Sequence, residues 1–200
     1  MENHITTNNN CQTTPLSSPL VIAITGHRFI EFSHPIIQAV NSVLSTIIEA
    51  HPDKEIELLN PLAEGADQLV AQESRNFINI HLVSVLPLPI DEYKETFVSE
   101  EGKIALDSYV KTSKKVITLP RVAHPSKAYQ QLGKFLVEKA EILIALWNGE
   151  KSNGFGGTGE VVELAQQFEK SVYWIYVDNL KKGVSNSFSK IMHPGEINCI

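Results

Sequence analysis

The sequence predicts an α/β protein in which helices cover both faces of a mainly parallel β-sheet of about six or seven strands, forming a three-layer sandwich. Short runs rich in β-branched residues alternate with longer segments whose apolar residues recur at helical spacing, which is the pattern of successive βαβ units. Several of the short runs are apolar at consecutive positions, as in strands buried on both faces. The chain has 200 residues, of which 42% are hydrophobic, enough for one sizeable core. We therefore expect a single domain over residues 19–200.

Six strands and four longer helices are expected in alternation. The strands cover residues 20–25, 55–59, 80–86, 115–119, 141–147 and 171–177. The first helix is expected behind Ser33-His34-Pro35, because proline fits the first helical turn and apolar residues follow at helical spacing. Further helices are expected within residues 65–79, 126–139 and 158–169. Residues 87–113 are charged and aperiodic, which favours an insertion or lid of short helices, and the tail beyond residue 178 predicts no element.

Composition narrows the classes of function. The net charge is −6 and the pI is near 5.6, which argues against non-specific binding to nucleic acid. Cys11 and Cys199 lie near opposite ends of the chain, which suits a reducing cytoplasm without disulfides. No apolar run has transmembrane length, and the polar residues 1–18 are expected to form a flexible leader. Histidine and cysteine spacing indicates no metal site, and no cofactor is expected.

A glycine-rich stretch follows the apolar strand 141–147 and opens the helix 158–169. It reads Gly154-Phe155-Gly156-Gly157-Thr158-Gly159-Glu160. Backbone amides at a helix N-terminus, with no side chain to hold a ligand away, offer converging donors and the positive end of the helix dipole to an anion. The stretch therefore predicts a phosphate cradle, in which Gly156, Gly157, Thr158 and Gly159 contact the ligand.

A second anion-binding turn, Gly26-His27-Arg28, follows the first strand. Arginine can hold a phosphate through two parallel hydrogen bonds. The alternative is a surface arginine paired with Glu31. Because parallel strands bring their carboxyl ends to one edge of a sheet, we expect this turn and the glycine-rich stretch to meet, and to bind a nucleotide or sugar phosphate.

Four carboxylates near these loops are candidates for contact with a ligand's sugar. After the second strand, Gly65 lets the backbone turn close to a ligand, and Glu64 or Asp67 offers an acceptor to ribose hydroxyls; helix capping explains the same residues equally well. Glu160 and Glu163 lie on neighbouring positions of the helix that the glycine stretch opens. For Glu160 the alternative is simple compensation of the helix dipole. The P-loop, nucleophile-elbow and dinucleotide-binding fingerprints are all missing from the sequence.

Three ordered motifs carry a resemblance to a known superfamily. They are Ile24-Thr25-Gly26-His27-Arg28, Pro61-Leu62-Ala63-Glu64-Gly65-Ala66-Asp67 and Gly156-Gly157-Thr158-Gly159-Glu160. Together they resemble the SLOG superfamily, which groups Rossmann-like nucleotide-binding domains with the LOG phosphoribohydrolases and the DNA-processing protein A domain. Over residues 20–177 the resemblance implies a Rossmann-like sandwich, often a homodimer, that binds a nucleotide or nucleotide-derived signal at the glycine loops.

The LOG enzymes carry Pro-Gly-Gly-x-Gly-Thr-x-x-Glu, and this chain departs from that motif. The glycines and Glu163 match, but Phe155 and Glu160 replace the proline and the threonine. The Arg-Lys pair of those enzymes falls on Leu132 and Gly133 by an ungapped count. A hydrolase of the N-glycosidic bond needs a carboxylate near the ribose and a cation for the phosphate, so this departure weakens the enzyme interpretation.

Two main hypotheses follow. In the first, the protein is a cytoplasmic sensor or carrier of a nucleotide or ADP-ribose-like ligand: His27 and Arg28 neutralise its phosphate, and Tyr129 or Trp147 stacks on its base. In the second, it is a nucleoside 5′-monophosphate phosphoribohydrolase with Glu160 or Glu163 as the catalytic carboxylate. A scaffold that has lost its ligand is a third reading, and it does not explain the retained glycine loops.

Overall fold

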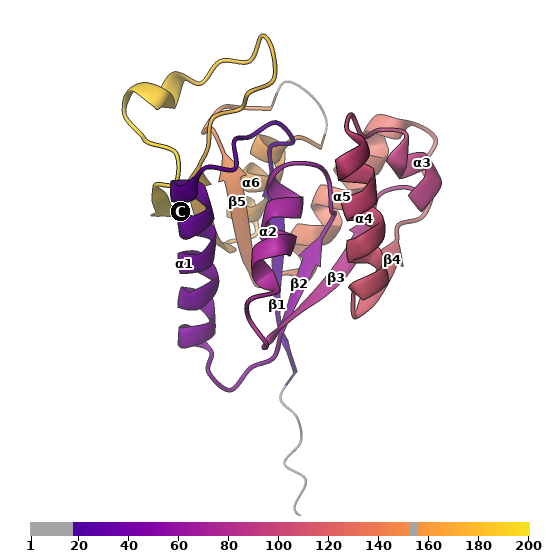
Figure 1. The fold of residues 1–200 in the computed structure, drawn as a ribbon, viewed down its shortest axis with the longest axis horizontal. Helices are drawn as coiled ribbons and strands as arrows, with labels where there is room; N and C mark the ends of the chain where they lie inside the picture. Colours follow the sequence, from indigo (N-terminus) through magenta and orange to yellow (C-terminus); the bar gives the residue numbers. More distant parts are fainter. Residues whose placement is uncertain (1–17, 153–155) are drawn as a thin grey trace, which may run out of the picture.

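A seven-stranded sheet forms the centre of the molecule (Figure 1). The computed structural model describes residues 18–152 and 156–200. The strands are β1 (Leu20–Gly26), β2 (Ile56–Asn60), β3 (Ile80–Leu86), β4 (Lys115–Thr118), β5 (Ile142–Trp147), β6 (Ser171–Tyr176) and β7 (Ile197–Cys199). The expected leader 1–18, apart from its last residue, and Gly154 and Phe155 of the glycine stretch lie outside the described residues.

The strand order is β4-β3-β2-β1-β5-β6-β7, and the strands from β1 to β6 all pair in parallel. The chain adds β2, β3 and β4 in turn toward one edge, then returns to place β5 on the other side of β1. This reversal is the topological switch point, outside which open α/β sheets bind their ligands. The fold is therefore Rossmann-like, and the mainly parallel sheet expected from the sequence is confirmed.

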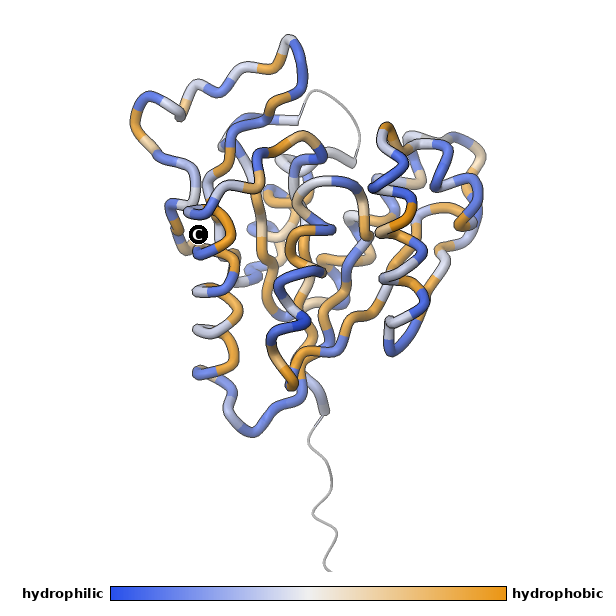
Figure 2. Tube along the Cα trace, in the orientation of Figure 1, coloured by the Kyte–Doolittle hydropathy of each residue, from blue (hydrophilic) through white to orange (hydrophobic). Residues whose placement is uncertain are grey.

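Helices cover both faces of the sheet. They are α1 (His34–Ala50), α2 (Ala66–Ser74), α3 (Ile90–Lys94), α4 (Glu100–Thr112), α5 (Pro125–Lys139) and α6 (Thr158–Gln167), followed by the short 3-10 helix η1 (Ser187–Lys190). Ser33 occupies the N-cap position of α1 in an extended conformation, without a side-chain capping bond, and proline occupies the first turn, as the sequence predicts. The apolar side of α1 faces the sheet (Figure 2).

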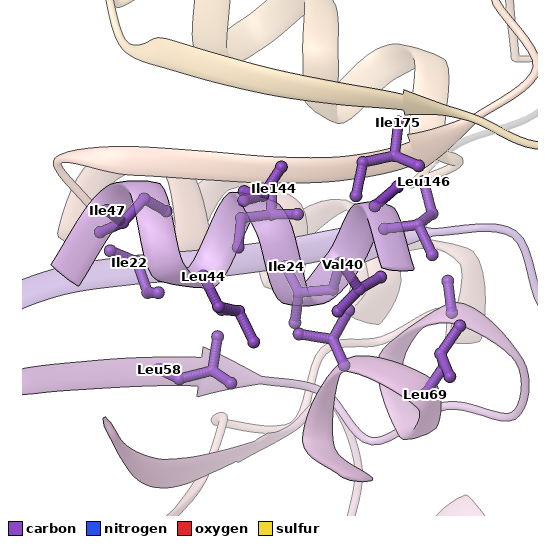
Figure 3. Close-up of a cluster of buried hydrophobic side chains, with 14 of the residues drawn as sticks. Ile22, Ile24, Val40, Leu44, Ile47, Leu58, Leu69, Ile144, Leu146 and Ile175 are labelled. Atoms are coloured by element: carbon purple, nitrogen blue, oxygen red, sulfur yellow. The ribbon is translucent and has the colours of Figure 1, made fainter. Parts of the chain in front are cut away.

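Two apolar cores separate the three layers. Consecutive residues of a strand point to opposite faces, so Ile22 and Ile24 of β1 enter one core while Ala23 enters the other. The first core joins the sheet to α1 and α2 (Figure 3). The second joins it to α5 and α6. With both faces covered, the carboxyl-terminal edge of the sheet carries the loops that remain open to a ligand.

Residues 87–113, expected to be an insertion or lid, form α3 and α4 around a third apolar cluster. Tyr93 and Phe97 lie at its centre with their rings edge to face, 5.1 Å apart. Leu106 and Tyr109 attach α4 to it. The segment is thus packed onto α2 and β3 and forms part of the folded domain.

The seventh strand, β7, lies beyond residue 178, where the sequence pattern predicts no element. It pairs antiparallel with β6 and covers that edge of the sheet. Its three residues, Ile197-Asn198-Cys199, are partly exposed and too few to establish a period, which is why periodicity does not reveal it. Among the described residues no helix is long and apolar enough to cross a bilayer.

Candidate ligand-binding site

A cavity of about 840 Å³ lies at the carboxyl ends of β1 and β5, at the topological switch point. Its wall includes the loop after β1, the loop after β5, the start of α6 and one side of α5. This volume falls in the range of small-molecule and cofactor sites, roughly 300 to 1,000 Å³. Seven of the residues expected to bind a ligand line it: Gly26, His27, Arg28, Asp67, Gly156, Gly157 and Thr158.

The glycines around this cavity allow parts of the protein to approach one another closely. A Cβ on Gly26 would lie 2.3 Å from the Cβ of Ala66, and a Cβ on Gly65 would lie 2.2 Å from the carbonyl oxygen of Arg28. The loop after β1 is also held by a hydrogen bond from the Ala66 amide to the His27 carbonyl, at 3.0 Å. Gly65, expected to approach a ligand, therefore approaches the backbone of Arg28 instead, and it does not line the cavity.

The start of α6 supplies backbone donors to the cavity. Gly156 has a φ of +74°, and a Cβ there would lie 2.6 Å from the Tyr129 backbone, so only glycine brings this turn so close to α5. The Gly156 amide donates to Glu160 Oε2 at 2.7 Å. The amides of Gly157 and Thr158, by contrast, have no acceptor within the described part of the chain and stand where an anion would meet the helix dipole.

The two glutamates of α6 lie apart from the main cavity. Glu160 caps the glycine turn through the Gly156 amide and accepts a second hydrogen bond from Gln130 Nε2 at 2.9 Å. It lines a smaller pocket between α5 and α6. Glu163 is exposed and lines neither pocket, and Gly159 is buried against the loop that precedes it. Neither glutamate lines the main cavity.

His27 is a neutral hydrogen-bonding group in this site. Burial lowers the pKa of its imidazole, an effect that the hydrogen bond with Asn148 only partly opposes. Its Nε2 atom lies 2.9 Å from Asn148 Oδ1, and Asn148 is fixed in turn by Ser185 and Asn186. His27 thus offers its other ring nitrogen, Nδ1, to a ligand, and it does not supply the positive charge that the sequence interpretation assigned to it.

Arg28 supplies the positive charge deep in the cavity. Its guanidinium donates to the Thr96 carbonyl at 3.0 Å and to the Tyr129 hydroxyl at 3.4 Å. It also lies over the rings of Phe97 and Tyr129, at 5.8 and 5.7 Å from their centroids. The alternative of a surface arginine paired with Glu31 is thereby excluded. Cation–π contacts and hydrogen bonds hold the side chain in place before a ligand arrives.

The loop after β2 places Asp67 in the wall of the cavity. Asn60 closes this loop by donating to the Asp67 carbonyl at 2.8 Å and accepting from the Leu62 amide at 2.7 Å. Leu62 takes a φ of +62°, an uncommon conformation for a bulky residue that is often found at functional sites. Asp67 is 5% exposed, and its Oδ2 accepts from the Ala63 amide at 3.2 Å. Burial raises the pKa of its carboxyl to about 7.

Glu64, expected at the ligand, instead holds the start of α4. Its carboxylate accepts from the Val98 and Ser99 amides and from the Ser99 hydroxyl, at 2.7 to 2.9 Å. Burial alone would raise the pKa of Glu64, but these hydrogen bonds outweigh it and hold the pKa below its usual range. The side chain does not line the cavity and serves the structure.

Several lining residues have no motif that would mark them in the sequence. Lys151 and Lys181 are exposed lysines at the mouth, and Tyr93 of α3 is fully buried in the wall. Asn148 follows β5 directly, and that position is the only signal that could have pointed to it. Of the aromatic candidates, Tyr129 lines the cavity, while Trp147 packs against Trp174 outside it. Within residues 18–152 and 156–200, no three histidine, cysteine or acidic side chains gather as a metal site would require.

Comparison with known proteins reveals little beyond this geometry. The chain matches no protein-family model and no curated protein. Among solved structures it is similar to the X-ray structure of TM1055, a structural genomics target, with a TM-score of 0.45 and 13% identity. The similarity covers 76% of this chain and 72% of that one. A likeness at this level says nothing about activity.

Proposed function

We propose that the protein binds a nucleotide or ADP-ribose-like ligand and acts as a sensor or carrier of it. The observation that carries the proposal is a concentration of cations at one cavity of an acidic protein. Arg28, Lys151 and Lys181 line this cavity, against the two acidic residues Asp67 and Glu150, in a chain whose net charge is −6. The start of α6 adds two amides that no described residue uses. These are the features that bind phosphate.

The resemblance to the SLOG superfamily supports the same proposal. Its first and third motifs contribute Gly26, His27, Arg28, Gly156, Gly157 and Thr158 to one cavity, and its second motif contributes Asp67. Tyr129 stands beside Arg28 and offers an aromatic face to a base. A homodimer and a cytoplasmic location are part of this proposal through the resemblance and the composition.

Calorimetric titration with AMP, ADP-ribose and cyclic ADP-ribose tests the proposal. At least one of these should bind to the purified protein, and Lys181→Ala should weaken that binding about two- to fivefold, as expected for the loss of one exposed charge–phosphate contact. Lys182→Ala is the matched control, because Lys182 is an equally exposed neighbour outside the cavity. Absence of binding by all three compounds, or equal losses in the two variants, would contradict the proposal.

A phosphoribohydrolase is the second candidate, and one observation favours it. Asp67 places a buried carboxyl with a pKa of about 7 in the cavity wall, which is the kind of group that general acid–base catalysis uses. Glu160 and Glu163, the carboxylates that the LOG motif suggests, stand outside the cavity. Incubation with a panel of nucleoside monophosphates separates the two candidates, since a hydrolase releases free base and ribose 5-phosphate and a sensor leaves the nucleotide intact.

A further inference from the structure

Two buried polar atoms in the cavity wall have no hydrogen-bond partner. They are Oδ1 of Asp67, at the start of α2, and the hydroxyl oxygen of Tyr93, on α3. No described residue satisfies either atom, and both side chains line the cavity. An unsatisfied buried polar group costs about 1 to 3 kcal/mol, so two of them on one wall need a reason.

The rest of the loop is hydrogen-bonded, so these two atoms are not signs of poor packing. The Asp67 carboxylate already holds the Ala63 amide through Oδ2, and Asn60 fixes the Asp67 backbone. The Tyr93 ring is fixed by its edge-to-face contact with Phe97 and is fully buried. One carboxyl oxygen and one phenol are therefore held in place without a well-formed hydrogen bond, and the Arg28 guanidinium lies close to the phenol.

The chemistry of this wall selects one kind of ligand group. A phosphate would bring negative charge to the Asp67 carboxyl, and an ammonium group would face the nearby Arg28 guanidinium, which interacts electrostatically with both Asp67 and Tyr93. A hydroxyl group avoids both conflicts. It can donate to the Asp67 carboxyl oxygen when that group is ionised, accept from it when it is protonated, and accept from the phenol.

We infer that Asp67 and Tyr93 form a hydroxyl-binding subsite and that the ligand carries free ribose hydroxyls beside its phosphate. This inference rests on the proposed function, because the cationic side of the cavity is assigned to the phosphate. The subsite selects ribonucleotides over analogues that lack the 2′- and 3′-hydroxyls. The analogue is rejected because it would leave both buried polar atoms unpaired.

The test compares AMP with 2′,3′-dideoxyadenosine 5′-monophosphate, which differ only in these two hydroxyls. By calorimetry the wild-type protein should bind AMP at least about tenfold more tightly than the dideoxy compound. A tenfold difference in affinity corresponds to the cost of leaving one buried hydrogen-bonding group unpaired. Tyr93→Phe removes one oxygen and keeps the ring. Asp67→Asn keeps an oxygen for the Ala63 amide and places its NH₂ group where Oδ1 stands, and a hydroxyl can accept from this group, so this variant should keep part of the preference. In Tyr93→Phe the preference should fall below about threefold, while the dideoxy compound binds as it does to the wild-type protein.

Tyr109→Phe is the matched control. Tyr109 belongs to the same apolar cluster as Tyr93 and is also buried, but it does not line the cavity. This variant should keep the full preference for AMP. Circular dichroism of each variant establishes that it is folded before titration.

Each other outcome has a distinct meaning. Equal affinity of the wild-type protein for the two nucleotides would overturn the inference and leave the proposed phosphate site intact. Variants that lose affinity for both nucleotides equally would show a structural role for Asp67 and Tyr93, which also overturns it. If neither nucleotide binds the wild-type protein, the inference falls together with the proposed function. Lys181→Ala should weaken both nucleotides alike, which separates the phosphate contact from the hydroxyl contact.

Discussion

Replacing Asp67 with asparagine should change how the stability of the ligand-free protein depends on pH. Asp67 is 5% exposed, and no cation lies within ion-pair distance of its carboxylate among the described residues. Burial raises the pKa of this carboxyl from 3.8 to about 7, while the hydrogen bond from Ala63 and the charge of Arg28 act in the opposite direction. Asparagine has nearly the same shape and cannot ionise.

The sign follows from proton binding. Between pH 4 and pH 7 the folded protein keeps a proton on Asp67 that the unfolded chain has lost, so the free energy of unfolding falls as pH rises. The stabilisation that the protonated Asp67 carboxyl gives to the folded protein is fully present below the unfolded pKa of 3.8 and is lost as pH rises through about 7. The shift is about three pH units, and at about 1.4 kcal/mol per unit the loss is about 4 kcal/mol.

Urea denaturation of the wild-type protein and Asp67→Asn from pH 4 to pH 8.5 measures this loss. Trp147 and Trp174, whose rings lie 5.4 Å apart, report unfolding through their fluorescence. Between pH 4 and pH 8.5 the wild-type protein should lose about 4 kcal/mol of unfolding free energy relative to the variant. Asp91→Asn, an exposed carboxylate on α3, controls for the removal of one carboxylate.

A difference between the wild-type protein and Asp67→Asn that stays constant across this pH range would refute the reasoning. It would mean that the folded protein ionises Asp67 as readily as the unfolded chain does. The same result would remove the case for Asp67 as an acid–base group.

Three further predictions concern the loops around the cavity. Gly65→Ala should lower the free energy of unfolding by more than about 2 kcal/mol, because Gly65 has a φ of +82° and the new Cβ would lie 2.2 Å from the Arg28 carbonyl oxygen. Thermal unfolding measures this loss of stability, and an unchanged Tm would count against the close approach. Glu64→Ala should speed hydrogen exchange at the Val98 and Ser99 amides, because both lose their acceptor, while exchange in β1 stays unaffected. Unchanged exchange at both amides would show that their hydrogen bonds to Glu64 are not formed in solution. Glu160→Ala should cost about 1 kcal/mol in urea unfolding, because the Gly156 amide loses its acceptor, and Glu160→Gln should restore most of it; an alanine variant as stable as the glutamine variant would contradict this.

The fold could be predicted from the sequence because each strand is a short apolar run between helical stripes. All six predicted strands are confirmed, within one residue at each end. A parallel strand buried on both faces needs such a run, and few other structures produce it. By contrast, β7 is a three-residue edge strand held by backbone hydrogen bonds to β6, and so short a run is not enough to predict a strand.

The site could be predicted only where the backbone determines it. Glycine turns after buried strands indicated Gly26 and Gly156, because parallel strands bring such turns to one edge. The direction of each charged side chain depends on tertiary contacts that sequence does not encode locally. Glu64 turns to α4 and Glu160 turns to its own loop. Asp67 resembles a solvated first-turn residue, yet α2 is buried on nearly every side between the sheet and its neighbouring helices.

Arg28 enters the cavity already immobilised. One of its terminal nitrogens donates to Thr96 and the other to Tyr129, and its guanidinium carbon lies over the rings of Phe97 and Tyr129. A guanidinium has five N–H groups, so those not used here are free to meet an anion without breaking either contact. Ordering a long side chain at a binding site costs roughly 0.5 to 1.5 kcal/mol, and here that cost is met during folding. A lysine at this position could not hold both partners in one plane, so its charge would have to be positioned anew for every ligand.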